Sequence, residues 1–115
     1  MQKVSNYEPL SHYVWGGNCE SWILVDSKSL SVKKEFMPPQ TGEVLHCHEK
    51  AQQFFFILKG IAIFEVEEQG FTLHAGQGLH IEAGKKHRIM NNTGEDLEFL
   101  LISQPSTNND RFNCI

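Results

Sequence analysis

Short runs of β-branched and aromatic residues recur along this chain, and turn-forming residues such as Lys59-Gly60 and Gln69-Gly70 separate them. No window of helical length carries an apolar stripe at a spacing of three to four residues, although Met1–His12 could form a turn or an arm. This rhythm predicts an all-β barrel or sandwich. The predicted strands are 22–25, 31–36, 44–48, 53–58, 61–67, 71–74, 79–82, 87–91 and 97–103.

Length and composition limit the class of protein. At 115 residues the chain can bury one hydrophobic core, so a single domain over 1–115 is expected. No run approaches the ~20 apolar residues that cross a bilayer, and the start lacks an apolar leader, which favours a cytoplasmic protein without a membrane partner. A net charge of −4 with dispersed Lys and Arg argues against nucleic-acid binding. Three cysteines without a CxxC pair fit a reducing compartment.

The run Phe54-Phe55-Phe56-Ile57-Leu58 is apolar on both faces of its predicted strand. Such a run is typical of a central strand that is covered on both sides. In a chain this small, the second cover can be another subunit. The sequence therefore predicts a homodimer.

Three histidines form the main candidate site. Alternate residues of a strand point to the same face, so His46 and His48 direct two imidazoles into one interior while Cys47 points away. A sheet then has only to bring His87 opposite them to complete a three-nitrogen site for a divalent transition metal such as Zn, Ni, Mn or Fe. The alternative is a set of buried barrel histidines that hold no metal.

From residue 40 to residue 91 the chain resembles the cupin superfamily, in particular its small single-domain members of the mannose-6-phosphate isomerase-like type. The first cupin motif, G-x5-H-x-H-x3–4-E-x6-G, spans about 40–60 and is matched by His46, His48 and Gly60, with Gln40 and Gln53 in place of the glycine and the glutamate. The second motif, G-x5-P-x-G-x2-H-x3-N, spans about 76–91. It is matched by Gly76, Gly84, His87 and Asn91, with Glu82 in place of the proline.

The resemblance implies a double-stranded β-helix, or jelly-roll barrel, with one divalent metal held by His46, His48, Gln53 and His87. Four protein ligands leave positions open for water or a substrate. Because Gln53 is neutral, the ion keeps its full charge, which strengthens it as a Lewis acid and disfavours higher oxidation states. Strand parity adds residues that share a face with these ligands and are expected to line the pocket: Phe55, Ile57, Ile89 and Asn91.

Three functions remain open from the sequence. The first is a non-redox isomerase or lyase acting on a small polar sugar or uronate. One small-cupin group that opens unsaturated uronates also has a glutamine ligand, but its last strand carries acidic and aromatic residues where this chain has Leu101, Ser103 and Pro105. The second is an Fe(II)-dependent dioxygenase, and the third is a non-catalytic module that binds a small ligand. The catalytic acid or base is left unassigned.

The remaining polar candidates are interpreted mainly as surface residues. His12, His74 and His80 are expected to be solvated, with His80 and Glu82 as an alternative pair that orients a metal ligand. Arg111 could bind a substrate carboxylate, although it lies in a polar tail. The apolar residues at 112–115 are expected to tether that tail to the barrel or to a second subunit.

Overall fold

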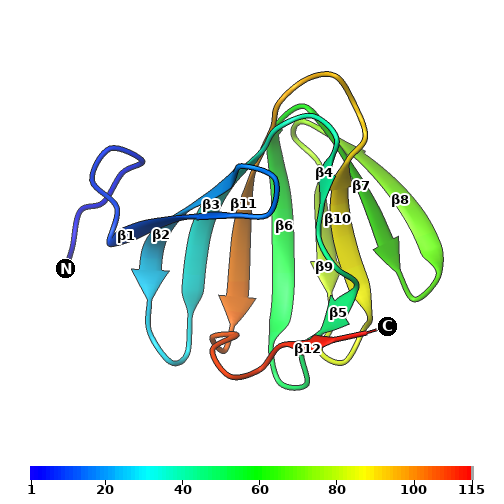
Figure 1. Cartoon of the computed structure of the whole chain (residues 1–115). Helices are drawn as coiled ribbons and strands as arrows, with labels where there is room; N and C mark the ends of the chain where they lie inside the picture. The colour runs from blue at the N-terminus through cyan, green and yellow to red at the C-terminus, as the bar shows by residue number, and fades with distance from the viewer. Residues whose placement is uncertain (115) are drawn as a thin grey trace.

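The strands of this chain form two antiparallel sheets that face each other (Figure 1). The computed structural model describes residues 1–114, so Ile115 of the predicted tether lies outside the described residues. The all-β prediction is confirmed: no helix occurs within 1–114, and nothing there is a helical segment of membrane-spanning length and hydropathy. The strands are β1 Ser11–Trp15, β2 Cys19–Asp26, β3 Ser31–Met37, β4 Thr41–Gly42, β5 His46–Cys47, β6 Gln52–Lys59, β7 Ile61–Val66, β8 Gln69–His74, β9 Gly78–Ile81, β10 His87–Asn91, β11 Leu97–Gln104 and β12 Phe112–Asn113.

The strand order produces the jelly-roll topology. One sheet runs β1-β2-β3-β11-β6-β9, and the other runs β12-β5-β10-β7-β8 with β4 paired to β10. Successive strands from β8 to β12 alternate between the sheets, and the last long strand, β11, lies between β3 and β6. The predicted double-stranded β-helix is confirmed by this arrangement.

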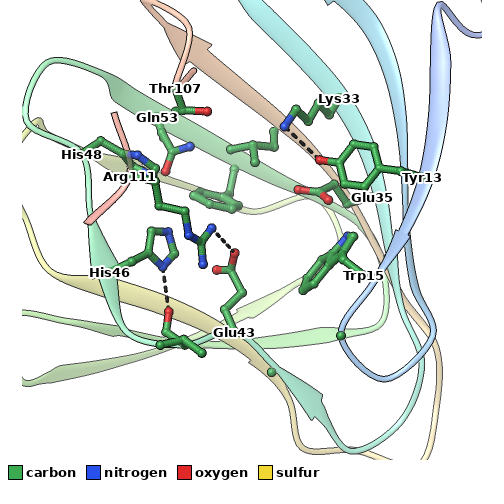
Figure 2. A pocket seen from close by; sticks show the side chains of 15 residues that line it. Tyr13, Trp15, Lys33, Glu35, Glu43, His46, His48, Gln53, Thr107 and Arg111 are labelled. Carbon is green, nitrogen blue, oxygen red and sulfur yellow. Dashed lines mark hydrogen bonds and ion pairs between the residues drawn. The ribbon is translucent and has the colours of Figure 1, made fainter. Parts of the chain in front are cut away.

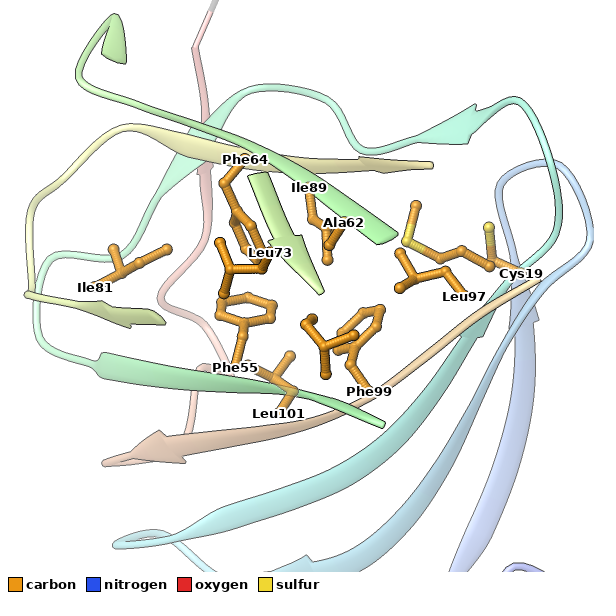
Figure 3. Close-up of a cluster of buried hydrophobic side chains, with 12 residues drawn as sticks. Cys19, Phe55, Ala62, Phe64, Leu73, Ile81, Ile89, Leu97, Phe99 and Leu101 are labelled. Atoms are coloured by element: carbon orange, nitrogen blue, oxygen red, sulfur yellow. The ribbon is translucent and has the colours of Figure 1, made fainter. Parts of the chain in front are cut away.

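The hydrophobic core lies between the two sheets and is built from inward positions of β2, β3 and β6 to β11 (Figure 3). In β6 the buried positions alternate, so Phe55 and Ile57 point inward while Phe54 is 38% exposed on the outer face. Phe55 packs edge-on against Phe64 of β7, with ring centroids 5.0 Å apart, and it also contacts Phe99 of β11. These aromatic contacts join the sheets at the centre of the barrel.

One predicted turn has a backbone that only glycine satisfies easily. Gly60 joins β6 to β7 with φ +86°, and a Cβ at this position would collide with the carbonyl oxygen of Asp96. Glycine has no such atom and adopts positive φ without strain. The motif glycine is thus required by the hairpin between the two sheets.

The structure adds strands that the sequence pattern did not predict. Ser11–Trp15 forms β1, which pairs with β2 through a turn containing Gly16 and Asn18 at positive φ. The sequence placed only the first two residues of β1 in a possible turn or arm over 1–12 and assigned the rest to no element. The first four residues of β1 are exposed, so no apolar alternation marks it. The predicted strand 44–48 was too long, since only His46–Cys47 pairs regularly. The strands β4 and β12 have two residues each, which is too short for an alternating pattern to be recognised in the sequence.

Candidate metal centre

The three motif histidines meet inside the barrel. His46 lies on β5 and pairs in register with His87, the first residue of β10, while His48 follows β5 directly. All three are at most 4% exposed. One nitrogen of each lies within 4.8 Å of the others, so the group could bind a metal ion, as the sequence predicted.

Main-chain carbonyls fix which nitrogen of each imidazole faces the centre. The Nδ1 of His46 donates to the carbonyl of Val44 at 2.8 Å, and the Nδ1 of His87 donates to Lys85 at 2.8 Å. The Nδ1 of His48 donates to the carbonyl of Asp110 at 2.6 Å. Because a carbonyl oxygen only accepts, each Nδ1 carries the proton and each Nε2 presents a lone pair. Such outer hydrogen bonds orient histidine ligands in metalloproteins.

Gln53 turns a fourth acceptor toward the same point. Its Nε2 donates to Ser103 Oγ at 3.0 Å, which directs Oε1 toward His87 Nε2 at 3.0 Å. Two acceptors at this distance repel each other unless a cation lies between them. In addition, His48 Nε2 is fully buried and is the one such side-chain nitrogen or oxygen in residues 1–114 without a hydrogen-bond partner. The donor set therefore fits a cation.

Burial keeps the imidazoles in the form that a metal requires. It lowers the pKa of His46 to about 3 and that of His87 to about 4, and it lowers the pKa of His48 as well. The hydrogen bonds to the main chain act in the opposite direction but do not outweigh burial. At neutral pH the three side chains are neutral ligands, with no proton to displace from Nε2.

The C-terminal segment supports the loop that follows His48. The Asp110 carboxylate accepts the backbone N–H groups of Glu49, Lys50 and Ala51 at 2.8, 3.1 and 3.0 Å. The carbonyl of the same residue holds His48, and β12 pairs with β5 immediately afterwards. Asp110 thus joins a distant part of the sequence to the histidine cluster, a role that no local pattern indicated.

A cavity of about 430 Å³ opens beside the histidines (Figure 2). His46, His48 and Gln53 lie at one end, and Tyr13, Lys33 and Glu35 lie at the other. The apolar wall between them includes Phe55 and Leu101. The volume suits a small molecule that reaches the histidine nitrogens with one end.

Only one of the four residues predicted to line the pocket does so. Phe55 contributes to the wall, but Ile57 and Ile89 are at most 1% exposed and belong to the hydrophobic core. Asn91 donates to the carbonyls of Met37 and Glu95 at 3.0 and 2.8 Å and so closes the turn after β10. Strand parity identified the correct face, but each of these residues lies further along the barrel axis than the ligands.

The cavity also contains two carboxyl groups, of the buried Glu35 and the partly buried Glu43, and an arginine. Burial raises the pKa of Glu43 to about 7 and raises the pKa of Glu35. Arg111 Nη1 lies 3.7 Å from Glu43 Oε2, so the tail arginine points into the cavity rather than into solvent. The sequence pattern indicated no role for either glutamate, because Glu35 lies on a strand with charged and apolar residues on both faces and Glu43 lies between strands.

The other histidines are exposed, as expected. His12 contacts Glu20 at 3.0 Å, and His80 contacts Gln52 at 2.8 Å. His80 and Glu82 do not orient a metal ligand, because main-chain carbonyls orient all three imidazoles.

Comparison with known proteins decides the family. Residues 34–103, more than half of the chain, match the cupin domain model. This chain is a cupin. The match covers both motifs, so the recognition made from His46, His48, Gly60 and His87 is confirmed. The single-domain boundary of 1–115 stays a prediction.

Two curated relatives match part of this cupin. An oxalate-binding protein from Thermotoga maritima is 32% identical over 66 residues, which cover 57% of this chain and 54% of that protein. An uncharacterized HTH-type transcriptional regulator, YdeC of Bacillus subtilis (strain 168), is 37% identical over 59 residues, 51% of this chain and 20% of the regulator. The matches thus span about half or less of these relatives.

Solved structures agree in fold. A predicted oxalate decarboxylase from Thermotoga maritima has a TM-score of 0.80 at 24% identity, covering 91% of this chain and 100% of that one. KdgF from Halomonas sp. has a TM-score of 0.83 at 15% identity, covering 92% and 94%. A sugar phosphate isomerase of the cupin superfamily from Silicibacter pomeroyi has a TM-score of 0.75 at 15% identity, covering 91% and 76%. At these identities the likeness concerns the fold alone.

Proposed function

We propose that this cupin holds one divalent metal through His46, His48, Gln53 and His87 and acts as a non-redox isomerase or lyase on a small polar sugar- or uronate-like molecule. The observation that carries the proposal is the convergence of acceptor atoms without donors, including the unpartnered Nε2 of His48. Zn, Ni, Mn and Fe all suit such a ligand set. A bound ion would act there as a Lewis acid toward a carbonyl or carboxylate oxygen.

The charged residues of the cavity support a carboxylate or phosphate on the bound molecule. Arg111 and Lys33 both line the cavity, and a guanidinium binds a carboxylate through two parallel hydrogen bonds. Relatives named for oxalate and for sugar phosphates also point to small anions as ligands. Because Gln53 is neutral, no negatively charged ligand would offset the higher oxidation states that oxygen chemistry requires. We therefore favour non-redox chemistry over the alternative of an Fe(II)-dependent dioxygenase.

The proposal is tested by metal analysis of protein purified without a nickel column, followed by a substrate screen. Wild type and His12→Ala, an exposed histidine, are expected to retain one ion per chain, whereas His46→Ala and His87→Ala lose it. Metal-loaded protein is then incubated with unsaturated uronates, sugar phosphates and oxalate, and products are followed by NMR with an oxygen electrode in parallel. Isomerised or opened product without oxygen consumption supports the proposal; oxygen consumption would favour the dioxygenase.

The match to a transcriptional regulator supports a second candidate, a non-catalytic module that binds a small ligand. The same cavity and metal centre would then capture the ligand without converting it. Saturable binding of a screened compound with no turnover would favour this candidate. Turnover by the metal-loaded protein would exclude it.

We also propose a homodimer in a reducing cytoplasm. The outer face of the sheet that contains β6 and β11 is apolar at Phe54, Phe56, Leu100 and Ile102, which lie on these two adjacent strands. A second copy would bury this face, and the free cysteines fit a reducing compartment. Light scattering of wild type and Phe54→Asp tests the dimer: a monomeric wild type would contradict it, and a dimer that Phe54→Asp dissociates would support it.

A further inference from the structure

The two carboxyl groups of the cavity, the buried Glu35 and the partly buried Glu43, have different surroundings. Glu43 has both oxygens engaged, because Oε1 accepts the backbone N–H of Ile89 at 3.2 Å and Oε2 lies 3.7 Å from Arg111 Nη1. These contacts suit a residue that anchors the arginine. Glu35 has no cation within 4.0 Å among residues 1–114, although it is only 6% exposed.

A chain of donors reaches Glu35 from the neighbouring strands. Ser21 of β2 pairs in register with Glu35 of β3 and is fully buried. The indole Nε1–H of Trp15 donates to Ser21 Oγ at 2.8 Å, and the Ser21 hydroxyl in turn donates to Glu35 Oε2. An indole nitrogen can only donate, so the single hydroxyl proton of Ser21 is committed to the carboxyl group.

This polarity determines where Glu35 carries a proton. Oε2 is occupied as an acceptor, so a proton on the carboxyl group resides on Oε1. Oε1 has no hydrogen-bond partner within the described chain and yet is not a fully buried atom, and the carboxyl end of Glu35 points into the cavity (Figure 2). The exchangeable proton therefore faces the space that a bound molecule would occupy.

We propose that Glu35 is the proton-transfer residue of this site, with Trp15 and Ser21 as its positioning residues. The assignment rests on the proposed function. As a carboxylate, Glu35 takes a proton from a carbon next to a carbonyl of the bound molecule: the C–H bond breaks, its electron pair stays on the molecule, and an O–H bond forms at Oε1. Return of that proton to a neighbouring atom completes an isomerisation or an elimination without any oxidant.

Burial supports this role because it raises the pKa of Glu35 and so makes its carboxylate a stronger base. The charged or titratable groups that influence Glu35 come from several elements. They are Lys33 on the same strand, Cys19 on β2, Glu43 after β4, and Arg111 in the C-terminal segment, and Tyr13 on β1 lines the same cavity. The facing residues of β11, Phe99 and Leu101, are apolar.

Infrared difference spectroscopy of the metal-free protein between acidic and basic pH tests the proton position. All comparisons are made in the Glu43→Gln background, because Glu43 also has a raised pKa and would give a carboxylic acid band of its own. The C=O band of Glu35 is expected to be present in Glu43→Gln and to disappear when Glu35→Gln is added. In Ser21→Ala it shifts to higher frequency, because the C=O group loses its donor. The band also shifts at once in D2O. A band that survives Glu35→Gln, or that Ser21→Ala leaves in place, would overturn the assignment.

Oxalate binding to metal-loaded protein tests whether Glu35 takes up a proton when an anion binds in the cavity, with calorimetry in two buffers of different ionisation enthalpy to count protons. Proton uptake on binding is expected in Glu43→Gln and is lost when Glu35→Gln is added to that variant; uptake retained by the double variant would contradict the role of Glu35. Metal content is measured on the same samples. Failure of all variants to hold metal would refute the proposed function, while the infrared result still decides the position of the proton.

Discussion

The two ends of the cavity are built in different ways. At the metal end, main-chain carbonyls of Val44, Lys85 and Asp110 hold the imidazoles. At the opposite end, side chains hold side chains, as in the series from Trp15 through Ser21 to Glu35. The fold itself supplies the first set of contacts, whereas particular residue choices supply the second. The metal end is therefore expected to tolerate changes elsewhere in the chain, and the β1–β3 end is expected to determine which reaction and ligand the site accepts.

The largest effect is expected from removing an imidazole at the metal end. His87→Ala leaves two histidines and Gln53, and its metal content should fall from one ion per chain to background. Replacing Glu35 at the other end should leave metal content unchanged. Elemental analysis with circular dichroism as a fold control measures both, and equal losses in the two variants would break the distinction between the ends.

Asp110→Ala tests whether a distant residue supports the metal end. The variant leaves three backbone N–H groups without their acceptor, which should lower the free energy of unfolding by about 3 kcal/mol. Loosening of the loop that carries His48 should also weaken metal affinity by about 10- to 100-fold, as outer-sphere changes do. Chelator competition and urea unfolding measure the two effects. Asp96→Ala, a substitution in the turn before β11, is the control and should change metal affinity little.

The pH dependence of stability sharpens the comparison at His46. Burial lowers its pKa to about 3 in the folded protein, so the unfolded chain binds a proton first as pH falls below 6.5. The contribution of this neutral histidine is present above 6.5 and is lost progressively toward pH 3, at up to about 1.4 kcal/mol per pH unit. Urea unfolding of metal-free wild type and His46→Gln should show a shallower slope in the variant. Identical slopes would contradict the neutral, buried state of His46.

The smallest effect is expected at Arg111, which adds to ligand binding without being required for the metal. Arg111→Lys keeps the positive charge but loses the paired donors of the guanidinium, so oxalate affinity of the metal-loaded protein should fall by about 10-fold. Calorimetry measures this change, with Arg88→Lys, whose partner is Glu65 on the barrel surface, as the control. An unchanged affinity in Arg111→Lys would remove the arginine from the ligand site.

The sequence predicted the metal end better than the other end for a physical reason. Strand parity is local, so it placed His46 and His48 on one interior face and Gln53 on an inward position of β6. Glu35 and Ser21 meet only through the register of β2 on β3. Asp110 and Arg111 reach the site through the return of the C-terminal segment. Contacts of this kind depend on how strands are ordered in the sheets, which no single window of sequence reveals.

The strands of the barrel also differ in how well the sequence predicted them. The alternation of Gln53, Phe55 and Ile57 made β6 recognisable, because one face of that strand is buried. β1 is exposed on both faces over most of its length, so its pairing with β2 leaves no apolar signature. Parity also placed Ile57 and Ile89 near the pocket, since it specifies a face and gives no position along the barrel axis.

Anomalous scattering from a crystal of the protein loaded with zinc or nickel tests the central claim most directly. The account predicts one strong peak at roughly 2.0–2.2 Å from Nε2 of His46, His48 and His87, with Gln53 Oε1 beside it. A map with no peak at this point, or with the ion bound elsewhere while the three histidines stay hydrogen-bonded to the main chain around an empty centre, would contradict it.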